Sequence, residues 1–286
     1  MRVYIATLSL LLILGACANN DELENQGGTE KQIYQAASDQ MEKGNYASAV
    51  KNFQLLEARF PFGPYAEQAQ LEIIYAYYKS FDMEAAIESA NRFVRLHPQH
   101  PNIDYAYYLR GLANYDEERG LFDRFLPADL TQRDTSSARQ AFTNFSELIH
   151  RFPNSDYAAD ARARMIYLKN NLARYEINVA NFYLDRGAYQ AAANRGRFVI
   201  EHFPQSTAVG DALAVMVQAY KLMHFDELAQ DNLKVLRQNY PNHPNLDKKG
   251  NFIAFYTDEG VKPGLVARLT GGLLGRDSPK QIDSRE

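Results

Sequence analysis

The chain has 286 residues, of which 46% are apolar and 23% are charged, so it carries enough apolar material to bury a sizeable core. Its 31 basic and 35 acidic side chains give a formal net charge of −4. This mild acidic balance lacks the electrostatic footprint of a nucleic-acid-binding protein, so we expect no nucleic-acid partner. The one cysteine, Cys17, excludes an intramolecular disulfide and any metal site that needs several thiolates.

Residues 1–16 have the pattern of a secretory signal peptide. Arg2 supplies a positive charge, and the apolar run Val3–Ala16 that follows is too short to span a bilayer comfortably. The run leads into Leu14-Gly15-Ala16-Cys17, which resembles a bacterial lipobox. We therefore expect cleavage before Cys17 and lipidation of that residue, with palmitate among the acyl chains, rather than ordinary secretion with an incidental cysteine.

The segment after the lipobox, residues 17–30, is polar, contains Gly27-Gly28 and is expected to be a flexible tether. Several acyl chains on one cysteine anchor a protein stably in a membrane. Residue 18 is Ala rather than Asp. By resemblance to enterobacterial lipoproteins, this favours the outer membrane over retention in the inner one.

An internal repeat follows, and its most regular feature is a proline after each helix-like segment: Pro61, Pro98, Pro153, Pro204 and Pro241. The residue twelve positions before each proline is alanine: Ala49, Ala86, Ala141, Ala192 and Ala229. The residue five positions before each proline is large and apolar: Leu56, Phe93, Leu148, Val199 and Leu236. Two units, ending at Pro61 and Pro153, also carry the A-x-x-x-F…P signature of a tetratricopeptide second helix. The pattern predicts helical hairpins in a common register.

Each residue type in this repeat has a physical role. Alanine lets the two helices of a hairpin approach closely, and the apolar positions four or seven residues later lie on the same helical face. Proline ends the helix because it has no N–H and clashes with the preceding turn. Short turns that contain Gly44 and Gly187 join paired helices, and glycine readily adopts the left-handed conformation of a helix cap.

The prolines are 37, 55, 51 and 37 residues apart, whereas an ordinary repeat needs about 34. The second gap holds residues 117–135, whose glycine, proline and charges predict a long loop, and the third holds residues 155–186, which predict one long helix. We predict an all-α tetratricopeptide-repeat solenoid of five helical hairpins. Residues 31–154 and 155–244 would form two subarrays joined by the long helix.

For the tail, residues 245–286, two interpretations stay open. Four glycines after residue 260 weaken any helix prediction and suit a disordered tail with one apolar segment. The other interpretation is that the tail docks onto a partner subunit or onto the open end of the solenoid.

Several segments together are far more specific than the generic repeat. They are Arg59-Phe60-Pro61-Phe62-Gly63-Pro64-Tyr65, Ile74-Tyr75-Ala76-Tyr77-Tyr78-Lys79, Arg92-Phe93-Val94-Arg95-Leu96-His97-Pro98, Pro101-Asn102-Ile103-Asp104-Tyr105 and Arg110-Gly111-Leu112. In these segments the chain resembles the BamD (ComL) family of outer-membrane protein assembly factors. The resemblance runs from the lipobox to about Pro241.

This resemblance implies five tetratricopeptide repeats on a lipid anchor at the periplasmic face of the outer membrane. It also implies a scaffold of the BAM complex, which promotes the folding and insertion of barrel proteins in Gram-negative outer membranes. The implied partners are BamA, through its membrane-proximal POTRA domain, other BAM lipoproteins, and the carboxy-terminal targeting segment of unfolded outer-membrane β-barrel proteins.

The candidate residues for holding that segment are aromatic side chains of the first subarray: Phe60, Phe62, Tyr65, Tyr75 and Tyr78. Stacked hairpins form a groove in which repeat proteins commonly bind extended segments. For any single aromatic residue, packing in the core is the more common alternative. Phe62 and Tyr65 fit the core least, because Gly63 and Pro64 put them in a turn.

Arg195 and Arg197 are the candidate residues for partner binding. The resemblance implies that Arg195 contacts an acidic residue of BamA, and arginine suits interface ion pairs through its planar donor fork. The alternative is a solvated helix arginine. Gly196, between the two, is smaller than the usual residue of the family and is expected to weaken the helix locally.

No catalytic motif is present: the sequence lacks a G-x-S-x-G elbow, a phosphate loop and an H-E-x-x-H pair. We therefore expect no enzyme activity, no metal and no cofactor besides the covalent lipid on Cys17. A lipoprotein scaffold for the peptidoglycan-synthesis machinery is the alternative function, since such scaffolds also use helical repeats. The preferred barrel substrates and the stoichiometry stay open.

Overall fold

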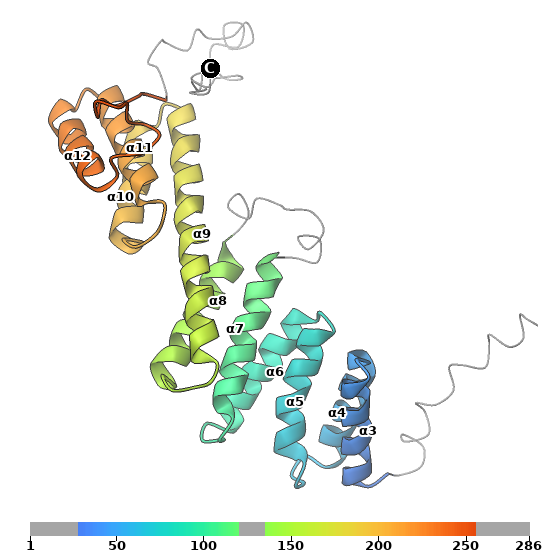
Figure 1. Ribbon diagram of the computed structural model, residues 1–286. Helices are drawn as coiled ribbons and strands as arrows, with labels where there is room; N and C mark the ends of the chain where they lie inside the picture. The colour runs from blue at the N-terminus through green and yellow to red at the C-terminus, as the bar shows by residue number, and fades with distance from the viewer. Residues whose placement is uncertain (1–27, 120–134, 256–286) are drawn as a thin grey trace, which may run out of the picture. The chain divides into compact units, whose positions relative to one another are not determined.

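The computed structural model describes residues 28–119 and 135–255 (Figure 1). Several predicted features lie outside this part of the chain: the signal peptide, the lipidation site Cys17, nearly all of the tether, most of the loop expected at residues 117–135, and the tail beyond residue 255. Within it there are ten α-helices, and the only β-feature is an isolated bridge between Leu246 and Phe252. The helices are α3 (Glu30–Glu42), α4 (Tyr46–Arg59), α5 (Ala66–Lys79), α6 (Met83–Leu96), α7 (Ile103–Arg119), α8 (Ser136–Arg151), α9 (Ala158–Asp185), α10 (Tyr189–His202), α11 (Val209–Leu222) and α12 (Asp226–Asn239).

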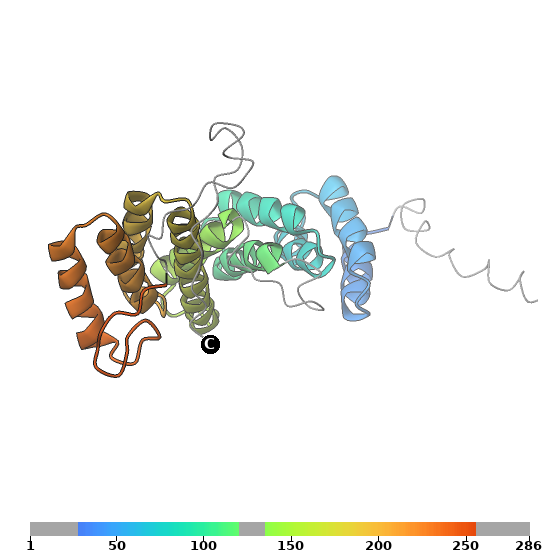
Figure 2. The ribbon, with the colours of Figure 1, turned by 90° about the horizontal axis from the view of Figure 1, so that it is seen from above.

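The chain forms two compact units, which are described separately. Unit 1 comprises Met1–Glu117 and Glu147–Ala158, and unit 2 comprises Glu118–Ser146 and Ala159–Glu286. In unit 1, helices α3 to α6 pack on one another in chain order, as Figures 1 and 2 show. In unit 2, α11 packs on both α10 and α12. Helical hairpins that stack on their neighbours in the chain are therefore the building block of both units.

The long helix predicted in the third proline gap is α9, which is continuous over 28 residues. The all-α class and the hairpin architecture are confirmed. The division into a substrate-binding subarray, residues 31–154, and a partner-binding subarray, residues 155–244, stays a prediction.

The five repeat alanines lie on the second helices of the hairpins and have the same environment. None of them is more than 1% exposed. The large apolar residues five positions before the prolines are equally buried, with exposed fractions of 0–1%. A small side chain followed seven residues later by a large one, both facing inward, is the helical register that the sequence predicts. This agreement in all five repeats confirms the tetratricopeptide-like pattern.

One hydrogen-bond pattern closes the second helix of each hairpin. The residue before the proline donates its backbone N–H to the carbonyl four positions earlier, as from Phe60 to Leu56 at 2.7 Å and from Phe152 to Leu148 at 2.8 Å. The residue two positions after the proline then donates back to the residue before the proline, as from Gly63 to Phe60 at 3.2 Å. Proline cannot donate and cannot continue the helix, so the chain turns here and starts the next hairpin.

Inside the hairpins, one residue of the connecting turn has a positive φ. Gly44 and Gly187 have φ angles of 74° and 71°, as the sequence predicts. The corresponding turns of two other hairpins place a side chain there, with φ of 64° at Phe81 and 60° at His224. A left-handed conformation costs an L-residue about 1–2 kcal/mol, so these two turns carry strain that the glycine-containing turns avoid.

The described end of the chain folds back on the last hairpin of unit 2. Leu246 is buried in a cluster with side chains of α11 and α12, and Phe252 and Phe255 pack against the same cluster. The backbone N–H of Phe255 donates to the Oε1 atom of Gln218 at 3.1 Å, and Gln218 itself is only 2% exposed. Residues 246–255 therefore cover apolar surface that a further repeat would otherwise bury. None of the described helices is long and apolar enough to cross a membrane.

The turn geometry predicts opposite effects for two substitutions. Gly44→Ala is expected to lower the free energy of unfolding by about 1 kcal/mol, because no atom crowds a Cβ there and only the φ of +74° opposes it. His224→Gly is expected to raise the free energy of unfolding by a similar amount, because His224 is exposed and its strain is removed. Thermal unfolding followed by circular dichroism measures both changes, and equal effects of the same sign would contradict the strain argument.

Candidate functional site

The candidate aromatic residues of unit 1 have different degrees of exposure. Phe62, in the turn before α5, is 98% exposed, so it makes almost no contact with the rest of the chain. Phe60 is half-buried and packs against the apolar cluster formed by α3, α4 and α5. Phe62 is thus free for a partner, whereas Phe60 contributes to the core.

Tyr65 begins a line of tyrosines along one side of unit 1. Its ring stacks on Tyr34 of α3 with a centroid distance of 4.8 Å, and its backbone N–H donates to Oε1 of Glu30 at 2.8 Å. The hydroxyl of Tyr34 donates to Oε1 of Glu72 of α5 at 2.7 Å. Tyr65 therefore connects, through Tyr34, to the middle of α5.

A second tyrosine stack occupies the same position of a later repeat. Tyr157 follows Pro153 by four residues, as Tyr65 follows Pro61, and its ring stacks on Tyr108 at 4.7 Å. Tyr105 lies 5.3 Å from the Tyr157 ring, measured between centroids. We call Tyr65, Tyr34, Tyr105, Tyr157 and Tyr108 the tyrosine row.

A hollow of about 510 Å³ lies beside the tyrosine row. Its lining comes from α5, the start of α7 and the turn before α9, and it includes the rings of Tyr105 and Tyr157. Three carboxylates also line it: Glu72, Asp104 and Asp156. Asp104 accepts a hydrogen bond from the hydroxyl of Ser155 at 2.6 Å, which ties α7 to that turn. A volume of this size falls in the range of about 300–1,000 Å³ that is typical of ligand pockets.

Burial and neighbouring acidic groups raise the pKa values of tyrosine hydroxyls at and beside the hollow. Burial, followed by the hydrogen bond to Glu72, raises the pKa of Tyr34 to about 12. Burial also raises the pKa of Tyr105, and the neighbouring Tyr157, Tyr75 and Glu72 add to the effect. For Tyr157, burial raises the pKa first and the carboxylates Asp104 and Asp156 contribute next. These hydroxyls therefore stay protonated and remain hydrogen-bond donors at any physiological pH.

Tyr75 and Tyr78 lie in the last turn of α5, roughly 15–20 Å along the helix from Tyr65. The ring of Tyr75 meets Tyr46 edge-on at 6.2 Å, and the ammonium group of Lys79 lies 5.9 Å from the Tyr75 centroid. The hydroxyl of Tyr78 donates to Asp116 of α7. The fold therefore distributes these candidate residues along the whole of α5, and it places beside Tyr65 and the hollow three residues that the sequence did not single out: Tyr34, Glu72 and Tyr157.

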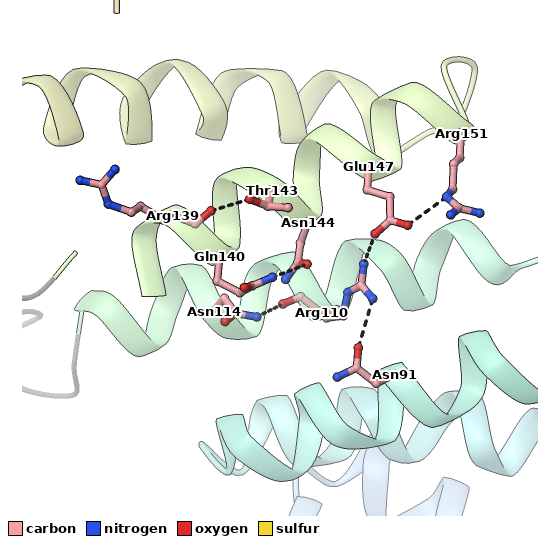
Figure 3. A network of polar contacts seen from close by, with 9 residues as sticks. All are labelled: Asn91, Arg110, Asn114, Arg139, Gln140, Thr143, Asn144, Glu147 and Arg151. Atoms are coloured by element: carbon pink, nitrogen blue, oxygen red, sulfur yellow. Dashed lines mark hydrogen bonds and ion pairs between the residues drawn. The ribbon is translucent and has the colours of Figure 1, made fainter. Parts of the chain in front are cut away.

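A network of polar contacts around Arg110 connects α7 to α6 and to Glu147 (Figure 3). Arg110 donates from Nη1 to Asn91 of α6 at 3.1 Å and from Nη2 to Glu147 of α8 at 2.6 Å. Glu147 also pairs with Arg151 at 2.9 Å. The Arg110 guanidinium lies 4.9 Å from the ring centroid of Tyr107, so these two residues lie on one face of α7, whereas Tyr105 and Tyr108 contact Tyr157.

In unit 2, Arg195 of α10 pairs with a buried carboxylate. Its Nη1 lies 2.8 Å from Oε2 of Glu176, and Nη2 of Arg139 lies 3.0 Å from Oε1 of the same group. Glu176 is 1% exposed, so the two arginines compensate a charge that would otherwise be costly to bury. Burial acts to lower the pKa of Arg195, but hydrogen bonds to Glu176 and Tyr183 raise it above its ordinary value.

Arg197 is the more exposed of the two candidate arginines, and its Nη2 donates to the hydroxyl of Tyr220 at 3.0 Å. Between them, Gly196 is buried where α10 crosses α11. A Cβ at this position would lie 2.8 Å from the carbonyl oxygen of Ala212 and 2.8 Å from Cγ of Met216. The glycine that weakens the helix locally is therefore what allows the two helices to approach.

Metal binding has no support in the described residues, where no group of three or more His, Cys, Asp or Glu side chains is placed to hold an ion. His97 instead forms a hydrogen bond with Oε1 of Gln70 at 2.7 Å, and its ring packs against Phe93 at a centroid distance of 5.0 Å.

The hollow beside the tyrosine row combines hydrogen-bond donors, acceptors and aromatic faces. This arrangement suits the binding of a polypeptide.

Comparison with known proteins gives a consistent result. A family described as outer membrane lipoprotein (YfiO) matches residues 26–236. The outer membrane protein assembly factor BamD of Neisseria gonorrhoeae is 42% identical over 251 residues, which cover 86% of this chain and 94% of that protein. BamD of Xylella fastidiosa is 41% identical over 241 residues, covering 84% of this chain and 82% of that protein, and BamD of Vibrio cholerae is 34% identical over 232 residues, covering 81% and 95%. The chain belongs to the BamD family.

The match to the outer membrane lipoprotein (YfiO) family model includes the tyrosine row, the hollow and both candidate arginines, and it ends within α12. The segment that covers the last hairpin, residues 246–255, follows it. Among solved structures, the MamA protein is similar over 74% of this chain and 92% of that chain, with 16% sequence identity and a TM-score of 0.33. This likeness is too distant to inform the site.

The pairing in unit 2 predicts a measurable cost for losing Arg195. Arg195→Ala is expected to lower the free energy of unfolding by about 1–3 kcal/mol, because Glu176 stays buried with one cation instead of two. Thermal unfolding of Arg195→Ala, Glu176→Gln and the double variant forms a thermodynamic cycle. The double variant is expected to lose less than the sum of the two single losses, and simple additivity would disprove the coupling. Arg197→Ala on the same helix serves as the matched control.

Proposed function

We propose that this chain is a non-enzymatic scaffold lipoprotein of the outer-membrane β-barrel assembly machinery. The observation that carries the proposal is the identity of 34–42% over more than four fifths of the chain with proteins named outer membrane protein assembly factor BamD. The chain binds the membrane-proximal POTRA domain of BamA, contacts other BAM lipoproteins, and binds unfolded barrel proteins. A lipid on Cys17 anchors it at the periplasmic face of the outer membrane, and it uses no other cofactor.

Unit 1 receives the targeting segment of the substrate in the hollow and along the tyrosine row. An extended segment presents backbone N–H and C=O groups that need partners, and the hollow offers amide side chains such as Gln68 and Asn102 together with carboxylates. The tyrosine rings supply broad apolar surface for the aromatic side chains of a barrel strand. Phe62 stands at the same end of the hairpins as this hollow, because it occupies the proline turn equivalent to residues 153–157.

Unit 2 binds BamA through the arginines of α10. Arg195 and Arg139 together carry two positive charges against the single charge of Glu176, so the pair retains an excess positive charge. Arg197 has a neutral hydroxyl partner and stays exposed. An acidic side chain on the partner is the group that such a surface attracts.

Substrate binding is tested by removing one exposed aromatic side chain. Phe62→Ala is expected to weaken binding of a fluorescently labelled carboxy-terminal barrel peptide to the mature chain several-fold, because a largely exposed ring contributes to binding and little to stability. Phe81→Ala is the matched control, since Phe81 is an aromatic side chain that is 52% exposed at the opposite end of α5. Unchanged affinity for Phe62→Ala would contradict the assignment.

Partner binding is tested by reversing one exposed charge. Arg197→Glu is expected to reduce co-purification of BamA with the tagged mature chain from detergent-solubilised membranes while helicity and melting temperature are retained. It is a cleaner test than Arg195→Glu, which would put a second carboxylate beside buried Glu176 and destabilise unit 2. Recovery of cell-wall synthases instead of BamA from the unsubstituted protein would favour the peptidoglycan-scaffold alternative.

A further inference from the structure

The hollow in unit 1 has an unbalanced set of charges. Its lining includes three carboxylates, Glu72, Asp104 and Asp156, and no Lys, Arg or His side chain. A second hollow in the same unit, of about 340 Å³, has Glu57 and Glu88 together with two arginines in its lining. The two hollows thus differ in charge although the same unit forms both, and only the first adjoins the tyrosine row.

The hydrogen-bond partners of Glu72 and Asp104 are neutral. Glu72 accepts from the Tyr34 hydroxyl at 2.7 Å and from Nε2 of Gln68 at 2.7 Å. Asp104 accepts from the hydroxyl of Ser155 at 2.6 Å and from the backbone N–H of Tyr105 at 2.9 Å. Neutral donors stabilise a carboxylate but leave its charge uncompensated, so these two groups, together with Asp156 in the same lining, create a negative potential there.

The aromatic side chains at the hollow add a second preference for cations. Tyr105 and Tyr157 lie with their centroids 5.3 Å apart, and Tyr108 stacks on Tyr157. The face of a tyrosine ring is negative and attracts an ammonium or guanidinium group within about 6 Å. The hollow is large enough for a long side chain and offers both carboxylates and ring faces. This combination suits a guanidinium ion best, because its planar group can stack on a ring while its N–H groups donate to a carboxylate.

We propose that this hollow makes unit 1 selective for charge, so that an extended polypeptide segment binds with a Lys or Arg side chain inserted between Glu72, Asp104 and Asp156. This inference rests on the proposed binding of substrate segments to unit 1 and adds the chemical class that is preferred. Segments with an acidic residue at the inserted position are rejected, because their charge would face three carboxylates in a partly desolvated space.

The experiment uses the mature chain and three labelled peptides of alternating aromatic and polar residues, amidated at the carboxy terminus, that differ at one central position: Arg, Gln or Glu. Affinity measured by fluorescence anisotropy at low salt is expected to follow Arg, then Gln, then Glu, with at least about a tenfold span between the extremes. The span is expected to narrow as salt rises, because the Debye length falls from about 10 Å at 0.1 M to about 3 Å at 1 M.

Two variants locate the effect. Glu72→Gln with Asp104→Asn removes two charges while keeping acceptors for Tyr34 and Ser155, and it is expected to reduce the affinity span among the three peptides to the small part that Asp156 contributes. Asp156→Asn, on an exposed side chain, is expected to reduce the span partially and remains informative if the double variant is unstable. Glu88→Gln in the second hollow is the matched control and is expected to leave the span unchanged.

The outcomes separate this inference from the proposed function. Equal affinity of the unsubstituted chain for all three peptides would overturn charge selectivity and leave substrate binding intact. If the affinity difference between the Arg and Glu peptides persisted in both variants, residues outside the hollow would cause it. That result would also overturn the assignment of selectivity to Glu72, Asp104 and Asp156. If none of the three peptides bound, both the proposed substrate site and this inference would be overturned.

Discussion

The helices of the repeats depend on a small, fully buried side chain in each second helix for close packing. The five repeat alanines are at most 1% exposed, and a larger residue at any of them would force the helices apart or strain the side chains around it. In unit 2 the same constraint is stricter at Gly196, where the Ala212 carbonyl leaves no room even for a Cβ. Close pairing fixes the register of each helix, and the register decides which side chains remain available for a partner.

Much of the fold follows from the sequence because it depends on contacts that recur at a fixed interval. Three residues act locally in each repeat: the proline after the second helix, the alanine twelve residues earlier and the glycine in the connecting turn. The structure of one repeat can therefore be predicted without knowledge of the others. The residues with positive φ at Phe81 and His224 were not predictable in this way. Their side chains disfavour that conformation, and only packing of the whole hairpin holds them in it.

The candidate site was harder to predict, because it depends on which repeats are neighbours and which faces they present. The sequence favoured Phe62 and Tyr65 and also named Phe60, Tyr75 and Tyr78, whereas the row that adjoins the hollow includes Tyr34 and Tyr157 from distant segments. One signal was available: Tyr65 and Tyr157 both follow a repeat proline by four residues. Buried Glu176 gave no such signal, since nothing local shows that a glutamate in the middle of a long helix meets two arginines.

The candidate sites of the two units differ in the sign of the charge that they leave uncompensated. In unit 2 the buried carboxylate of Glu176 is paired with two arginines, and Arg197 nearby on α10 is exposed with a neutral partner. In unit 1, Arg110 is paired with Glu147, while Glu72 and Asp104 at the hollow keep neutral partners. The candidate site of unit 1 thus presents uncompensated carboxylates, whereas that of unit 2 presents an excess of guanidinium groups. Under the proposed function, in which each unit binds a different polypeptide, this difference gives discrimination, because a segment suited to one site is repelled by the other.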